Sequence, residues 1–221
     1  MKMSPLMTVF IALALALSFS TYAQAAITIK TEPTKELFED VPLLASATLN
    51  VDSTSSNLVP VSHGLRKKAV FGLVPVRVYV LELLAAQGNK LTKTEEGILK
   101  SLKEAGPVLL QITFLRDLPG SKISEAFKDG LESNKVNVKS LTPEMKQVLD
   151  EISNIKEFKK HESFSIAISW KDPQATISLQ QAGAEVKSIA GSSDFAEQFL
   201  SIWFGHPSDG RLGDLKKSLL K

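Results

Sequence analysis

The 221-residue sequence contains no cysteine, which excludes disulfide bridges, thiolate metal sites and a cysteine nucleophile. It has three histidines, His63, His161 and His206, and none has a second candidate ligand at helical or strand spacing. We therefore expect no metal site and no cofactor. A Gly-rich phosphate loop and a Gly-x-Ser-x-Gly elbow are also missing, so no catalytic residue can be nominated from a motif.

An excess of charge of one sign is missing as well. The chain carries 26 Lys and Arg against 24 Asp and Glu, a formal net charge of +2. Nucleic-acid-binding domains usually show a clustered basic excess, so nucleic acid is not expected as a partner.

A long apolar run occurs near the N-terminus, where residues 6–17 read LMTVFIALALAL. Lys2 precedes this run and Ala23-Gln24-Ala25 follows it, as in a secretory signal peptide. The alternative, an uncleaved membrane anchor, needs about 20 apolar residues, and no segment of this chain is that long. We predict a signal peptide over residues 1–25, export to the periplasm, and one domain over residues 26–221.

The rest of the chain shows strand and helix signals in blocks. Residues 27–40 show no clear pattern. Strands are predicted within 44–85 and over 108–115, 163–170, 175–180 and 184–190. Helices are predicted over 94–105, from Ser121, from Thr142, over 193–204 and over 212–220. This order predicts an α+β fold in which helices are layered on an antiparallel sheet.

The stretch GLRKKAVFGLVPVRVYVLELLA (64–85) predicts a β-hairpin. If Gly72 and Leu73 are the central residues of its turn, Arg66 lies directly opposite Tyr79. The same register pairs Lys68 with Arg77 and predicts a core-facing set on the other side: Ala69, Phe71, Val74, Val76, Val78 and Val80. The Arg66–Tyr79 pair has two interpretations. It is either an exposed cross-strand contact, or an anion site where guanidinium and phenol both donate to one ligand oxygen.

Four segments then stand in a distinctive order: 64-GLRKK-68, 78-VYVLEL-83, 112-ITFLRDLPGSKISEAFKDGLESN-134 and 199-FLSIWFGHPSDGRLGDLKKSLL-220. In this order and spacing they resemble the chalcone isomerase-like family, specifically its secreted bacterial branch. The resemblance implies an open-faced β-sandwich of chalcone isomerase type, a large antiparallel sheet covered by a layer of helices. Members include plant flavonoid-cyclising enzymes and plastid fatty-acid-binding proteins, which hold a ligand between sheet and helices.

The resemblance also implies roles for individual residues. Arg66 matches the family arginine that contacts the ligand's anionic oxygen, and Tyr79 stands at the spacing of the tyrosine that joins it in fatty-acid-binding members. The enzymes carry a tyrosine, an asparagine and a hydroxyl residue at the positions of Ile123, Gly130 and Gly210. None of these three residues has a polar side chain, so the polar network of the enzymes is depleted here.

We therefore expect a non-catalytic binder of a fatty acid or similar amphipathic anion, with Arg66 and Tyr79 holding its head group. Ile123, Phe127 and Leu131 are expected to form the apolar pocket wall against which the acyl chain packs. Two alternatives stay open: an isomerase or intramolecular lyase for a chalcone-like enone, and a periplasmic scaffold without a small-molecule ligand. A cavity over Arg66 would favour a ligand-binding protein, and a solid core there would favour the scaffold.

Overall fold

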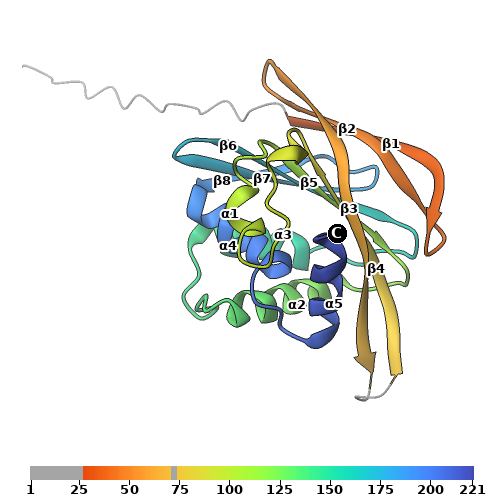
Figure 1. Cartoon of the computed structure of the whole chain (residues 1–221). Coiled ribbons are helices and arrows are strands. Elements are labelled where there is room, and N and C mark those ends of the chain that lie inside the picture. The colour runs from red at the N-terminus through yellow and green to blue at the C-terminus, as the bar shows by residue number, and fades with distance from the viewer. Residues whose placement is uncertain (1–26, 71–73) are drawn as a thin grey trace, which may run out of the picture.

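The computed structural model of the chain describes residues 27–70 and 74–221. Within these ranges, eight strands form one antiparallel sheet in which every strand lies beside its neighbours in chain order (Figure 1). The strands are β1 (Ile27–Phe38), β2 (Val41–Val51), β3 (Thr54–Val70), β4 (Val74–Ala85), β5 (Val108–Phe114), β6 (Ser163–Lys171), β7 (Gln174–Gln181) and β8 (Lys187–Ser192).

Helices cover one face of this sheet, and α5 lies against β3 (Figure 1). They are a 3₁₀ turn (Gly88–Lys90), α1 (Ile98–Ser101), α2 (Gly120–Ser133), α3 (Pro143–Ser153), α4 (Ser193–Phe204) and α5 (Gly210–Leu219). The structure thus has the predicted α+β architecture, an open antiparallel sheet with a helical layer. No helix in the described ranges is long and apolar enough to cross a membrane.

Side-chain caps fix where three of the helices begin. Thr142 accepts a hydrogen bond from the Met145 N–H at the start of α3, and Pro143 follows as the first helical residue. Ser192 caps α4 and Asp209 caps α5 in the same way. The cap of α5 also fixes the position of the Asp209 carboxylate.

The sheet has apolar residues on both faces. The main core lies between the sheet and the helices, and it includes Tyr79, Leu81 and Leu83 of β4. A smaller core lies on the outer face, where β2 packs against the central strands: Leu44, Ala47, Leu49, Leu58, Leu84, Leu109 and Ala167. Strand β5 is buried along its whole length for this reason, which explains why most of its residues are apolar; Gln111 and Thr113 are its two polar residues.

Two expectations from the sequence are wrong. Residues 27–40 showed no pattern, yet most of them form the edge strand β1. The helix expected over 94–105 is much shorter, because only Ile98–Ser101 is helical. The residues on either side of it, 95–97 and 102–105, form turns. Gly97 packs closely on Thr92, where a Cβ would lie 2.4 Å from the Thr92 Cγ2.

Candidate ligand-binding site

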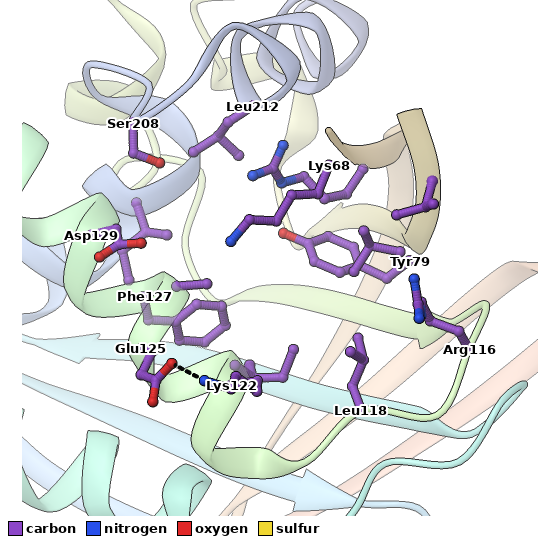
Figure 2. A pocket seen from close by; sticks show the side chains of 16 residues that line it. Lys68, Tyr79, Arg116, Leu118, Lys122, Glu125, Phe127, Asp129, Ser208 and Leu212 are labelled. Atoms are coloured by element: carbon purple, nitrogen blue, oxygen red, sulfur yellow. Dashed lines mark hydrogen bonds and ion pairs between the residues drawn. The ribbon is translucent and has the colours of Figure 1, made fainter. Parts of the chain in front are cut away.

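A cavity of about 350 Å³ lies on the helical side, between the end of the β3–β4 hairpin and α2. Figure 2 shows side chains from both sides pointing into it. Its apolar lining includes Val76, Val78, Leu118, Ile123, Phe127 and Leu212, and its charged or hydroxyl lining includes Arg66, Lys68, Tyr79, Arg116, Lys122 and Glu125. An apolar wall facing several cations is a typical setting for an amphipathic anion.

The hairpin brings Arg66 and Tyr79 together at this cavity. They are direct cross-strand partners, as turn counting predicted. Nearer the turn, however, a bulge between Arg66 and Lys67 shifts the register, so Arg77 faces Lys67 and not Lys68. The proposed turn residues Gly72 and Leu73 lie outside the described residues.

The predicted core-facing set of the hairpin is wrong for two of its five described members, while Val76 and Val78 are half-buried. Val80 is fully buried, but Ala69 is exposed and 63% of Val74 is exposed. Phe71 lies outside the described ranges. The end of the hairpin extends past both the helical layer and β2 (Figure 1), and Ala69 and Val74 are left uncovered there. Arg66 and Tyr79 instead point to the covered side and are 7% and 5% exposed.

The Arg66 guanidinium is engaged by an acid from the other end of the chain. Its Nη1 and Nη2 donate to Oδ1 and Oδ2 of Asp209 at 2.9 and 2.6 Å, a bidentate ion pair. Nη1 also donates to the carbonyl of Lys67. The Asp209 carboxylate therefore already accepts hydrogen bonds from guanidinium N–H groups that were predicted to bind a ligand.

The Asp209 carboxylate both pairs with Arg66 and caps α5. Its Oδ1 also accepts the Leu212 N–H at 2.8 Å, which caps α5. Burial alone would raise the pKa of Asp209, but hydrogen bonds from Arg66 and from the Leu212 N–H outweigh burial, and its pKa is lowered. Asp209 was not among the site residues predicted from the sequence, although an aspartate just before a short helix is a recognisable N-cap signal.

Tyr79 is held by the helical layer. Its hydroxyl oxygen accepts a hydrogen bond from the indole Nε1 of Trp203 in α4 at 3.1 Å. Burial raises the pKa of Tyr79, while the charge of Arg66 and the bond from Trp203 oppose that rise. The phenol therefore stays protonated at neutral pH and can donate its proton. Figure 2 shows this hydroxyl and the Lys68 amino group pointing into the same space.

Further cations line the cavity. Lys122 is paired with Glu125 at 2.8 Å, and this bond lowers the pKa of Glu125. Lys68 and Arg116 have no hydrogen bond or ion pair to any described residue. With Arg66 neutralised by Asp209, the lining still has three cationic side chains (Lys68, Arg116 and Lys122) against two acidic ones (Glu125 and Asp129). This small positive excess favours an anion.

Helix α2 supplies the apolar wall. Ile123 and Phe127 line the cavity, whereas Leu131 is buried in the core behind it. Gly130 packs against α4, where a Cβ would lie 2.9 Å from the Ile202 Cγ2, so an asparagine does not fit there. Gly210 faces open space, and the hydroxyl that lines the cavity near it belongs to Ser208.

These features define an open-faced β-sandwich with a cavity between sheet and helices. The family model described as chalcone isomerase-like matches residues 44–221, so the chain belongs to the chalcone isomerase-like family. A solved fatty-acid-binding protein of Arabidopsis thaliana has a similar fold, with a TM-score of 0.57 and 18% sequence identity. The match covers 86% of this chain and 96% of that one. No curated protein matches the sequence.

Proposed function

We propose that this protein binds a fatty acid or a similar amphipathic anion in the cavity between the β3–β4 hairpin and α2. The observation that carries the proposal is the cavity itself, about 350 Å³, apolar along Ile123 and Phe127 and cationic along Arg66 and Lys68. Its volume lies within the range of about 300–1,000 Å³ that is usual for small-molecule sites. The family relative that binds fatty acids has the same fold, which is consistent with the proposal.

Two forces would hold the ligand. Each methylene buried against the apolar wall contributes about 0.8 kcal/mol, before the cost of immobilising the ligand is subtracted. The head group would accept hydrogen bonds from the Tyr79 hydroxyl and the Lys68 ammonium. It would also reach Arg66, either through the N–H groups that Asp209 leaves free or by displacing Asp209.

The first experiment removes co-purified lipid and titrates the protein with dodecanoate and, separately, with dodecanol. We expect dodecanoate to bind more tightly, because only the acid brings a negative charge. Arg66→Ala should weaken dodecanoate about tenfold or more, since hydrogen bonds to a charged group contribute about 1.5–3 kcal/mol. Arg77→Ala is the matched control, because Arg77 lies on the same hairpin but pairs with Glu39 away from the cavity. Equal binding by wild type and Arg66→Ala would contradict the proposed head-group position.

We also propose that the chain is exported and cleaved near Ala25, so that the ligand is met in the periplasm. The support is the sequence pattern of residues 1–25. Expression of the full chain in a bacterium, followed by osmotic shock and N-terminal sequencing, tests this. A protein that stays in the cytoplasm with residues 1–25 intact would contradict it. Native mass spectrometry of the exported protein would then show whether a lipid co-purifies.

A further inference from the structure

A second cavity lies on the opposite face of the sheet, away from Arg66 and the helices. It has a volume of about 310 Å³ and is bordered by β1, the start of β2 and the central strands β4, β5 and β6. Side chains alternate along β4, so Tyr79, Leu81 and Leu83 face the helices while Glu82 faces this outer pocket. The two cavities therefore share strand β4 but no lining residue.

The outer pocket contains a buried carboxylate. Glu82 is 3% exposed, and its Oε2 accepts the Leu44 N–H at 2.8 Å. Its other oxygen has no partner among the described residues, and no described lysine, arginine or histidine forms an ion pair with it. A buried charge with a single neutral hydrogen bond is costly. Burial accordingly raises the pKa of Glu82, although the Leu44 bond opposes the rise.

Anchoring β2 does not explain a carboxylate at this position. The bond to Leu44 uses one oxygen, and a neutral glutamine would supply that acceptor without the cost of burying a charge. The remaining oxygen is free to serve something else. Because it belongs to a side chain that is almost completely buried and lines a cavity, that partner would have to enter the cavity.

The neighbours of Glu82 are polar too. Gln111 lies directly opposite it on β5 and is 4% exposed. The Gln111 amide oxygen accepts the Ser165 hydroxyl at 2.7 Å, while its amide nitrogen has no partner among the described residues. Asp40 and His161 also line the pocket, and no lysine or arginine does. The pocket is therefore acidic, with hydrogen-bonding groups on the sheet side.

The wall of the pocket formed by β1 and the start of β2 is largely apolar, and this indicates which class of ligand would fit. Pro33, Val41, Pro42 and Leu44 contribute carbon surface to the same pocket. A metal ion would make no use of that surface, and no group of three or more candidate metal-ligating side chains is found in the described ranges. A carboxylate facing carbon surface suits an organic cation.

We propose that the outer pocket binds a small primary ammonium compound, with its charged nitrogen on Glu82 and its carbon chain against the start of β2. The ammonium group would donate a hydrogen bond to the free carboxylate oxygen of Glu82, and its charge would remove the cost of leaving that carboxylate unpaired. This site is independent of the anion site on the helical face.

The test uses butylammonium chloride as the probe and 1-butanol as its uncharged counterpart, with amide signals followed by NMR in amine-free buffer. The titration is run at about pH 8 because a higher pH favours the ionised carboxylate, and butylammonium should shift the Leu44 N–H and the Gln111 side-chain amide saturably. Glu82→Gln keeps an acceptor for Leu44 and should weaken butylammonium about tenfold or more. Glu125→Gln, which changes the other cavity, should leave the titration unchanged.

Several outcomes would overturn the proposal. One is the absence of saturable shifts up to about 100 mM butylammonium, since a site with millimolar Kd would be visible there. Another is that 1-butanol binds as tightly as butylammonium, which would mean that the pocket recognises the alkyl chain and not the positive charge. This comparison uses only the wild-type protein, so it stays decisive if Glu82→Gln folds poorly. Equal binding by wild type and Glu82→Gln would also reject Glu82 as the anchor.

Discussion

Arg66 on β3 and Asp209 at the N-terminus of α5 form a bidentate ion pair across 143 positions of sequence. The pair joins the hairpin that lines the cavity to the last helix, because Asp209 also caps α5. Arg66 is the residue proposed to meet a ligand carboxylate, so Asp209 is an internal competitor for the same guanidinium. A ligand that displaces it also removes a cap from α5.

The first prediction concerns this competition. Asp209→Asn keeps an N-cap side chain but removes the charge that neutralises Arg66. We expect the free energy of unfolding of the unliganded protein to fall by about 1–3 kcal/mol, because a buried guanidinium loses its counter-ion. Dodecanoate should bind more tightly than to wild type, because it no longer competes with Asp209. Denaturation and calorimetric titration measure the two effects.

Asp214→Asn is the matched control for that variant. Asp214 lies on the same helix, but it is exposed and pairs with Arg211 away from the cavity. Its loss should change neither stability nor dodecanoate affinity appreciably. If Asp209→Asn binds dodecanoate more weakly than wild type, Asp209 supports the site and does not compete with the ligand.

The second prediction concerns the bond between Tyr79 and Trp203. Tyr79→Phe removes the acceptor of a buried indole N–H, which should cost about 1–3 kcal/mol of unfolding free energy. Trp203→Phe alone should cost at least as much, because it also removes core volume. In the double variant the penalties should be less than additive, since neither group is then left without its partner. Strict additivity in a denaturant series would mean that this bond contributes nothing.

Local signals in the sequence predicted much of the fold. The start of α3 follows from the cap residue Thr142, and the pairing of Arg66 with Tyr79 follows from counting along one hairpin. Edge strand β1 was missed because it is mostly exposed and carries a proline, so it has little apolar alternation to read. The register shift beside Arg66 was missed because a bulge depends on the surrounding packing more than on its own residues.

The site could be predicted only in part, because its decisive contacts are non-local. Asp209 and Trp203 reach the hairpin from the C-terminal helices, and no spacing rule connects residues more than 100 positions apart. The sequence could not predict the unpaired oxygen of Glu82 for a similar reason. In the sequence Glu82 is one acid within an apolar run, and only the fold of β2 over the sheet buries it.

The third prediction uses two glycines with different surroundings, Gly130 against α4 and Gly210 in open space. Gly130→Asn forces a side chain against Ile202 and should cost about 1–3 kcal/mol through overpacking. Gly210→Asn faces open space and should change stability by less than about 0.5 kcal/mol, as surface substitutions usually do. Urea denaturation of both variants checks the contrast. A Gly130→Asn protein as stable as wild type would show that α2 and α4 can move apart.

The fourth prediction concerns the pH dependence that Glu82 imposes. Burial raises its pKa, so the folded protein holds the proton more tightly than the unfolded chain does. The stability that this group contributes is therefore greatest at low pH, and it falls as pH rises from the ordinary Glu pKa of about 4.3 through the raised value. Glu82→Gln cannot titrate, so its free energy of unfolding relative to wild type should increase over that interval.

Denaturation of both proteins from about pH 4 to 8 in amine-free buffer measures this difference, in which titrating groups far from Glu82 cancel. The titratable side chains that face Glu82 are His63, directly opposite on β3, and Asp40 and His161 in the same pocket. Glu125→Gln is the control, because Glu125 is exposed and its pKa is shifted in the opposite direction by Lys122. Its difference from wild type should be nearly flat or should slope the other way. Adding butylammonium should stabilise the wild type at the alkaline end and leave Glu82→Gln unchanged, since only an ionised Glu82 offers the ammonium a charge partner. A flat difference curve for Glu82→Gln would mean that the buried carboxylate carries no cost, and the reason for a cation in the outer pocket would disappear with it.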